Sequence, residues 1–553
     1  MELIHIRAFT TEEVSEKLMV LLTSGIALSK QTVADIMTLS DFIDKNKIDE
    51  IKNREVKIAL YKKYNIVPKN PEEFLRYLIF VCTGNTLKIQ DVNTINSIKR
   101  CERIIAIDLF ENYNKLFGYN KLSSIFLRNK NLFLAFKVQK RDYETKIETE
   151  NRKKINYIIN KLRKLANKNH KPLSPNVLDN ISNTLSRFTS EFILEALDNV
   201  TIFRELRILN GLLYRLSGSN DMLYKIRNGK AYYKKIEIKG WEYSILKDRY
   251  KLIYNHLINR LSKKIKGKTI YIPKNVCYAV PTSEKQFNGN FPNGSYIEIP
   301  RDGDLIYGIH WTNLPSNKKS NTEFYGEYNK NEEERVDLDL HQMNNSQIFG
   351  WNSNYRDERG NILFSGDITD APSPKGATEL FYVDKNYGYG AFSMSVNMYT
   401  HNSQDVPFEF VIAKSDHNIN ERVNYVINPN NILEKINMTM SKDQREKNSG
   451  LIVIGDTIKL YLNDFSTGNR CATKQDEVTK GTFSYLQTYS KVQLKLNDLL
   501  KIAGAILTDQ PTITGLAYMD DKGEIIESYE KPVDYDLSPN NITKETIIDL
   551  LSD

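Results

Sequence analysis

Cysteine is scarce in this chain, and its spacing excludes two common uses of the residue. The four cysteines are Cys82, Cys101, Cys277 and Cys471. No two of them are separated by two residues, so the sequence predicts neither a zinc knuckle nor a disulfide framework. We expect them to pack as small buried apolar side chains.

Long apolar runs are also missing. The 553 residues include no stretch that approaches the roughly 18 apolar residues of a membrane helix. The first residues, Met1 to Arg7, read as a short strand and lack the cationic and then apolar layout of a secretory signal. The sequence therefore predicts a cytoplasmic protein with no membrane partner.

Motifs of common catalytic sites are missing too. The chain contains no G-x-x-x-x-G-K-S/T, no G-x-G-x-x-G after a strand, no G-x-S-x-G and no H-E-x-x-H. Its seven histidines lie far apart, which neither builds nor excludes a catalytic triad. Asp367 and Asp370 could exchange protons with a substrate, but nothing in the sequence marks either of them as desolvated. Catalysis is the least supported class of function, and we expect no enzyme.

Hydrophobic periodicity divides the chain into three parts. Residues 1–267 show the spacing of helices, with strong helix starts at Thr10 and at Asn70. Residues 268–465 contain short strand-like runs separated by Gly, Pro and Asn, a pattern typical of a β-sandwich. Residues 466–553 mix the two patterns. We therefore predict an α+β multidomain protein with an N-terminal helical array or bundle, a β-sandwich and a small mixed α/β C-terminal portion.

Positive charge is concentrated in one segment of the helical part. Residues 137–171 contain twelve basic and four acidic residues, so this segment alone carries the net charge of the whole chain, +8. A second basic segment, Tyr224 to Lys235, is rich in tyrosine. Basic faces with aromatic rings bind phosphates and stack bases, which predicts RNA or another polyanion as a partner. The alternative is a solvated helix face and a basic turn. The candidate residues are Arg152, Lys153, Lys154, Lys161, Arg163, Lys164, Lys168, Arg227 and Lys230.

Negative charge is gathered on two strand-like segments of the β part. Asp337 and Asp339 alternate with apolar residues, so we expect both on one face of a strand. Asp367 and Asp370 follow another apolar run, and Glu379 comes after the next turn. Neighbouring carboxylates repel each other unless water or a cation separates them. The alternative to a cation is that these acids cap turns and keep sheet edges soluble. The candidate metal ligands are Asp337, Asp339, Asp367 and Asp370.

The same region resembles the TerD-like domains of tellurium resistance and stress response, over about residues 304–416. The resemblance comprises Gly308-Ile309-His310-Trp311, the strand Val336–Leu340, the Gly366-Asp367 turn, and the strands Phe392–Asn397 and Phe408–Ile412. It implies a β-sandwich that binds calcium through the acidic positions named above. The chain departs from the family after Asp370, where Ala371–Glu379 replaces a densely acidic glycine loop and includes Lys375. The order of a basic helical part and a β-rich part also resembles the layout of Ro/TROVE RNA-binding proteins, without a shared motif.

Together these patterns predict a non-catalytic binding or scaffold protein of a stress or defence system. Its β-sandwich is expected to bind calcium and its helical part to bind RNA or another polyanion. The alternative function is a structural or assembly protein, cellular or viral, that uses both parts for protein–protein contacts. The 32 tyrosines and 23 phenylalanines leave that alternative open, because exposed aromatic side chains favour such contacts.

Overall fold

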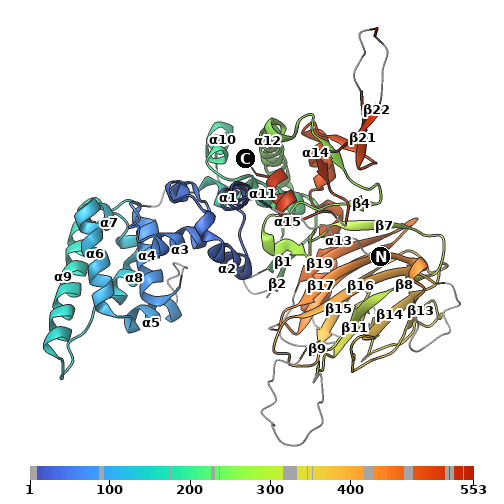
Figure 1. Ribbon diagram of the computed structural model, residues 1–553, viewed down its shortest axis with the longest axis horizontal. Coiled ribbons are helices and arrows are strands. Elements are labelled where there is room, and N and C mark those ends of the chain that lie inside the picture. Colours follow the sequence, from blue (N-terminus) through green and yellow to red (C-terminus); the bar gives the residue numbers. More distant parts are fainter. Residues whose placement is uncertain are drawn as a thin grey trace, which may run out of the picture. The chain divides into compact units, whose positions relative to one another are not determined.

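The computed structural model of the protein confirms the α+β multidomain prediction (Figure 1). Helices dominate the N-terminal half and antiparallel sheets dominate the C-terminal half. The chain divides into two compact units, Met1–Val177 and Leu178–Leu551. The structure describes residues 9–85, 92–172, 176–185, 187–225, 231–235, 237–315, 333–344, 347–351, 353–415, 427–442, 444–465, 477–516, 522–523, 528–539 and 541–552. Among the helices in these ranges, none combines the length and the apolar character that crossing a bilayer requires.

The first unit is built from helices. Thr10 closes a capping box with Glu13, and Asn70, which precedes Pro71, accepts hydrogen bonds from the backbone N–H groups of Glu72 and Glu73, as the sequence predicts. Gly84, in the left-handed conformation, ends the second of these helices. The α-helices are α1 (Thr11–Thr23), α2 (Lys30–Thr38), α3 (Arg54–Lys63), α4 (Pro71–Thr83), α5 (Val92–Arg100), α6 (Arg103–Phe117), α7 (Tyr119–Ser123), α8 (Lys130–Ala135) and α9 (Lys146–Asn169).

Aromatic side chains form much of the core of this unit. Phe74, Phe110, Phe126, Phe133 and Phe136 are fully buried. The rings of Phe126 and Phe133 stack with their centroids 5.0 Å apart, and Phe110 meets Phe136 edge-on at 5.8 Å. Each such pair adds about 1 kcal/mol to the stabilisation from burial. Phe74, on α4, meets Phe110, on α6, at 6.1 Å, and Phe110 lies 6.5 Å from Phe133, on α8, so ring contacts join these three helices into one packed body.

Three helices within residues 1–267, the predicted helical domain, belong to the second unit. They are α10 (Ser190–Asp198), α11 (Ile202–Leu216) and α12 (Gly240–Ile265). Between α11 and α12 lies an antiparallel hairpin of β1 (Asp221–Lys225) and β2 (Ala231–Lys235). The units therefore separate at residue 177, and the boundary predicted at 267 falls inside the second unit. The helical spacing continues across residue 177, and nothing in it reveals the change of packing partner.

A buried ionic network joins α10, α11 and α12. Glu205 is completely buried, ion-pairs with Arg260 and lies 3.1 Å from Nδ1 of His256. The other ring nitrogen of His256 lies 3.0 Å from a carboxylate oxygen of Asp198. Burial raises the pKa of Glu205, while both of its partners lower it. The network fixes the relative positions of the three helices, because a buried carboxylate without partners is strongly destabilising.

The β-sandwich consists of two antiparallel sheets. The seven-stranded sheet has the order β12-β11-β15-β18-β19-β7-β4, and the five-stranded sheet has the order β13-β14-β8-β16-β17 (Figure 1). The strands are β4 (Val276–Cys277), β7 (Tyr296–Pro300), β8 (Leu305–Trp311), β11 (Leu338–Met343), β12 (Ile348–Gly350), β13 (Ile362–Phe364), β14 (Ala377–Val383), β15 (Gly390–Met398), β16 (Val406–Lys414), β17 (Ile432–Met440), β18 (Glu446–Ile454) and β19 (Thr457–Phe465). Two short hairpins flank them, β5 (Phe287–Asn288) with β6 (Phe291–Pro292) and β9 (Leu314–Pro315) with β10 (Glu333–Glu334).

The two sheets face each other across a buried core. The hydroxyl of Tyr307, on β8, donates to Oε1 of Gln342, on β11, at 2.5 Å, and both residues are completely buried. The indole N–H of Trp311 donates to the carbonyl of Val336 at 3.0 Å. Gln342 therefore points into the sandwich, as do Leu338 and Leu340, because alternate residues of a strand share a face. Asp339 and His341 consequently point to the other face of β11.

The C-terminal portion packs on the helices of the second unit and on its sheets. It contains α13 (Glu477–Val492), α14 (Leu496–Ile502), α15 (Lys544–Leu550), β20 (Ile506–Thr508), β21 (Thr512–Leu516), β22 (Ser528–Pro532) and β23 (Tyr535–Asp536). β20 and β23 pair in parallel with β3 (Thr269–Tyr271), so β3 is not a strand of the sandwich, although the predicted sandwich began at 268. Such pairing joins segments more than 200 residues apart and leaves no local signal.

Candidate metal centre

The candidate site lies at an edge of β11 that has no strand partner within the described parts of the chain. β15 pairs with the whole of β11, whereas β12 pairs only with His341–Met343. Among the described strands, none pairs with the other edge of Leu338–Leu340. The backbone N–H of Leu340 points to that edge and donates to Oε2 of Glu379, on β14, at 2.6 Å. A carboxylate from the opposite sheet therefore takes the place of a neighbouring strand.

Glu379 connects the two segments that carry the aspartates. Its second oxygen, Oε1, accepts from the backbone N–H of Ile368 at 3.0 Å. Leu340 directly follows Asp339 and Ile368 directly follows Asp367, so one buried carboxylate holds both aspartate positions together. Glu379 is completely buried, and burial raises its pKa well above the usual range although both N–H donors lower it. Glu379 therefore has a structural role, because its two oxygens hold the backbone segments that carry Asp339 and Asp367.

Three aspartates meet at this edge. Asp337, Asp339 and Asp367 each offer a carboxylate oxygen, and these oxygens lie within 4.8 Å of one another. Asp337 and Asp339 are only 3% and 4% exposed, whereas Asp367 is exposed. Among the described residues, Oδ1 of Asp337 and Oδ2 of Asp339 have no hydrogen-bond partner. Buried anionic oxygens without partners are costly, and a cation is the group that would compensate for them.

The electrostatics of the cluster agree with that geometry. Burial raises the pKa of Asp339 to about 7, and the charges of Asp337 and Asp367 add to the increase. Burial also raises the pKa of Asp337, against the opposing effect of Arg335. Without a cation, the site therefore resists carrying all of its negative charges at neutral pH. A divalent cation would reverse this preference.

Arg335 is the one basic side chain that ion-pairs with the described cluster. Its Nη2 atom lies 2.6 Å from Oδ2 of Asp337, and its Nε donates to the carbonyl of Thr369 at 2.7 Å. One positive charge leaves the three aspartates with two uncompensated negative charges. It also leaves Oδ1 of Asp337 and both oxygens of Asp339 outside the ion pair. Arg335 therefore reduces the charge of the site without filling it.

The structure brings three of the four predicted ligands together and places the fourth elsewhere. Oδ1 of Asp370 accepts from the side-chain amide of Asn313 at 2.9 Å, and Asp370 lies outside the cluster. Both oxygens of Glu379 accept backbone hydrogen bonds. Three carboxylates would leave water to complete the six to eight oxygen ligands that calcium takes. A set of oxygens alone favours calcium, magnesium or manganese over zinc.

A buried polar row next to the aspartates was not predicted from the sequence. Asn397, on β15, pairs in register with Asp339 and is 1% exposed, and its Oδ1 has no partner among the described residues. Its Nδ2 lies 3.5 Å from Nδ1 of His341. Burial lowers the pKa of His341 to about 4, so this imidazole is neutral at pH 7. The signal in the sequence was the alternation of Ser393, Ser395 and Asn397 within an otherwise apolar strand.

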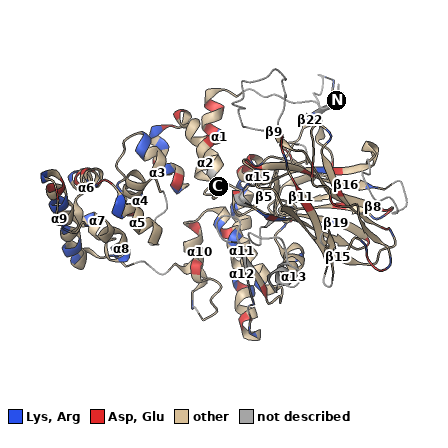
Figure 2. Cartoon of the chain, turned by 90° about the horizontal axis from the view of Figure 1, so that it is seen from below, with Lys and Arg blue, Asp and Glu red and all other residues tan. Residues whose placement is uncertain are grey.

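The predicted basic residues of α9 are largely exposed. The helix buries one apolar stripe and presents the opposite side to solvent, and Figure 2 shows Lys and Arg along it. Lys154, Tyr157, Lys161, Lys164 and Lys168 follow one another at intervals of three and four residues, which places them on one face. Tyr157 is 64% exposed. Six cations are exposed and, within the described residues, form no ion pair: Lys153, Lys154, Lys161, Arg163, Lys164 and Lys168.

The remaining predicted basic residues do not join this face. Arg152 lies 2.8 Å from Oε2 of Glu144, and its side chain is mostly buried. The ion pair neutralises its charge, so Arg152 contributes to the structure of α9 more than to its potential. Arg227 and Lys230 lie outside the described residues.

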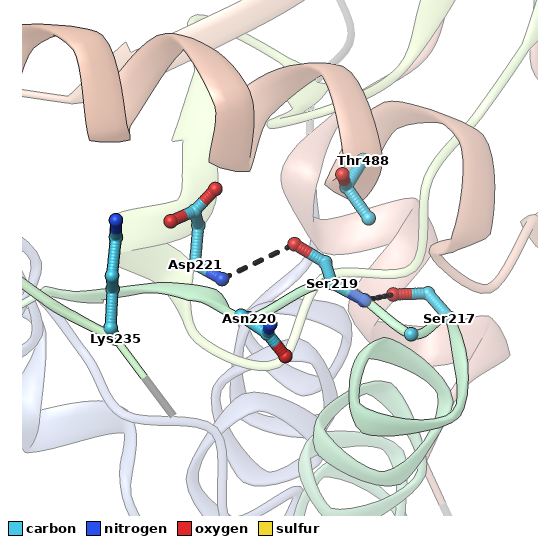
Figure 3. A pocket seen from close by; sticks show the side chains of 7 residues that line it. Ser217, Ser219, Asn220, Asp221, Lys235 and Thr488 are labelled. Carbon is cyan, nitrogen blue, oxygen red and sulfur yellow. Dashed lines mark hydrogen bonds between the residues drawn. The ribbon is translucent and has the colours of Figure 1, made fainter. Parts of the chain in front are cut away.

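The second unit also contains a polar pocket beside the β1–β2 hairpin (Figure 3). Its volume is about 480 Å³, and Ser217, Ser219, Asp221, Lys235 and Thr488 contribute polar groups to its lining. Oδ2 of Asp221 accepts from the hydroxyl of Ser484, on α13, at 2.5 Å. The lining includes neither histidine nor cysteine and only one carboxylate, so it offers no metal-ligand set.

No protein-family model matches the chain, and no curated protein matches it. The resemblance to TerD-like domains and the likeness to Ro/TROVE proteins therefore stay predictions.

Proposed function

We propose that this chain is a non-catalytic binding protein whose β-sandwich holds a divalent cation, with calcium as the expected ion. The observation that carries the proposal is the pair of buried aspartates, Asp337 and Asp339. Each has one oxygen without a hydrogen-bond partner among the described residues, and each offers an oxygen within 4.8 Å of one from Asp367. A hard cation prefers such oxygen ligands, and water would complete its coordination. A stress or defence role in the cytoplasm is the part of the proposal that rests on the family resemblance alone.

The cation would act as a link between two segments of the sandwich. Asp337 and Asp339 belong to the edge of β11, and Asp367 belongs to the loop between β13 and β14. Glu379 and Arg335 already hold these segments together through hydrogen bonds. A bound calcium ion would therefore stabilise an existing arrangement instead of creating a new one.

Isothermal titration calorimetry of the full chain with calcium or magnesium tests this proposal. We expect calcium to bind the native protein and to lose at least tenfold in affinity in Asp337→Asn and Asp339→Asn, because each removes a charged ligand. Asp370→Asn is the matched control, since it removes the same charge from a residue outside the cluster. No calcium binding by the native protein, or an equal loss in the control, contradicts the proposal.

We propose a second function for the first unit, which is to bind a polyanion, with RNA as the expected partner. The supporting observation is the exposed face of α9, where cations without ion pairs surround Tyr157. Phosphates would replace the counterions of these side chains, and the released counterions would make binding dependent on salt. The exposed tyrosine ring could stack with an unpaired base.

Binding of a single-stranded RNA at several salt concentrations tests the second function. Removing four cations from the exposed face of α9 should weaken binding at low salt. It should also lower the slope of log K against log salt by about 3, or about 0.7 for each phosphate contact. The variant replaces Lys154, Lys161, Lys164 and Lys168 by Gln. The control replaces Lys17, Lys47, Lys52 and Lys62, which are exposed elsewhere in the same unit. Equal curves for the two variants refute the role of α9.

Light scattering with and without nuclease separates RNA binding from the alternative function in assembly. A particle whose mass falls after nuclease treatment supports RNA binding. A large particle that nuclease does not change supports protein–protein assembly.

A further inference from the structure

Two cysteines that are far apart in the sequence meet in the first unit. Cys82 lies in the last turn of α4, and Cys101 lies between α5 and α6. Their thiols lie close enough to interact electrostatically with each other. Both residues are half-buried, as is Cys277, whereas the sequence predicted small buried apolar side chains. Cys471 lies outside the described residues.

A fixed positive charge lies beside one of the two sulfurs. Nη1 of Arg103 donates to Sγ of Cys101 at 3.0 Å. The same guanidinium donates to the carbonyls of Ile98, Lys99 and Cys101 at 2.7–2.9 Å, which are carbonyls at and just beyond the C-terminal end of α5. These bonds hold the guanidinium in place, so its charge cannot move away from the sulfur as that of an unrestrained arginine could.

The environment distinguishes the two thiols. The interaction with Cys82 and the charge of Arg103 lower the pKa of Cys101 to about 7, although burial opposes them. The interaction with Cys101 and burial raise the pKa of Cys82. When the pair loses its first proton, Cys101 therefore becomes the thiolate and Cys82 keeps its proton. Cys101 has the character of an attacking thiolate, and Cys82 that of a second thiol that can resolve a mixed disulfide.

We propose that Cys82 and Cys101 form a redox-reactive dithiol site that low-molecular-weight disulfides, such as oxidised glutathione, convert into an intramolecular disulfide. The Cys101 thiolate attacks one sulfur of the reagent, a mixed disulfide forms, and one glutathione thiolate leaves. Cys82 then transfers its proton to solvent and attacks Sγ of Cys101, which releases the second glutathione. Two protein thiols are oxidised and one glutathione disulfide is reduced to two thiols, so atoms and electrons balance.

Peptide mass spectrometry of the full chain, treated with oxidised glutathione at neutral pH, tests the site. We expect the native protein to lose two hydrogen atoms and to yield a cross-linked peptide pair containing Cys82 and Cys101. Cys82→Ser should instead accumulate a stable glutathione adduct on Cys101. Cys101→Ser should leave Cys82 no more reactive than Cys277, the internal control, whose pKa burial raises. A lasting adduct on native Cys101, or no reaction there, refutes the proposal.

A second measurement needs no substitution. Alkylation of the native protein by iodoacetamide at pH 7 should modify Cys101 about threefold faster than an ordinary thiol with a pKa of about 8.5, because its larger thiolate fraction outweighs its lower nucleophilicity. The rate at Cys101 should level off near pH 7–8 in the reduced protein, whereas the rate at Cys277 should still be rising. Equal pH profiles for the two cysteines would remove the special role of Arg103.

Discussion

Replacing Asp339 by Asn should remove a destabilising charge from the protein when no cation is bound. The pKa of Asp339 rises from about 3.8 to about 7 on folding, and its side chain is 4% exposed. An acid with a raised folded pKa favours folding below its unfolded pKa, and this contribution is lost as pH rises through the folded pKa. At about 1.4 kcal/mol for each pKa unit, the loss between pH 4 and pH 8 is about 4 kcal/mol. The side chain of Asn does not titrate, so the Asp339→Asn variant lacks this contribution to the pH dependence of stability.

Calorimetric melting of the native protein and of Asp339→Asn, in chelator and in calcium, measures this effect. The second unit has about 370 residues, so 4 kcal/mol corresponds to a change of about 5 °C in its melting temperature. We expect the variant to melt higher than the native protein at pH 8 in chelator and the two to converge near pH 4. Calcium at a hundred times its Kd for the native protein should add about 2.7 kcal/mol to the native protein and at most about 1.4 kcal/mol to the variant, whose affinity is at least tenfold lower.

Asp339→Asn is expected to be more stable than the native protein in chelator and to gain less stability from calcium, and a single structural defect would not produce both results. A merely structural aspartate would make the variant less stable in chelator and would leave its response to calcium unchanged. Asp370→Asn should behave like the native protein under both conditions. If the native protein in chelator is as stable at pH 8 as at pH 5, and calcium stabilises both proteins equally, the reasoning about Asp339 is refuted.

Three further substitutions probe the frame that positions the site and the second unit. Glu379→Ala leaves two backbone N–H groups unpaired and should cost about 1–3 kcal/mol for each in urea unfolding, with a lower calcium affinity. Gly308→Ala places a Cβ 2.0 Å from the carbonyl oxygen of Glu379 and should destabilise by about 1–3 kcal/mol, while an unchanged unfolding midpoint would contradict this packing. Glu205→Ala removes the buried carboxylate that pairs with both Arg260 and His256 and should cost about 3–5 kcal/mol, measured by the same method.

Local features of the fold could be read from the sequence because local chemistry produces them. Thr10 and Asn70 satisfy the first N–H groups of a helix wherever they precede one, and both caps are confirmed. The alternation that places Asp339 opposite Leu338 and Leu340 follows from the pleat of any strand. The sequence therefore predicted the succession of helical and β-rich parts and the face of β11 that carries the acids.

Partners of helices and strands could not be read in this way. Residues 178–267 have the same helical spacing as the first unit, yet they pack with the β-rich part. β3 pairs with strands more than 200 residues away, because parallel pairing needs no turn between neighbours. Alternation also does not show that both faces of β11 are buried, since burial depends on what covers the outer face.

The sequence by itself determined where helices begin, where strands replace them and which residues carry the charge. Only the tertiary structure decided which charges are buried, which aspartates share a site and which cysteines touch. Glu379 brings Asp339 and Asp367 together across two sheets, and the turn between α5 and α6 brings Cys101 to Cys82. The physical reason is range: capping and alternation act over a few residues, whereas desolvation and pairing depend on neighbours supplied by distant parts of the chain.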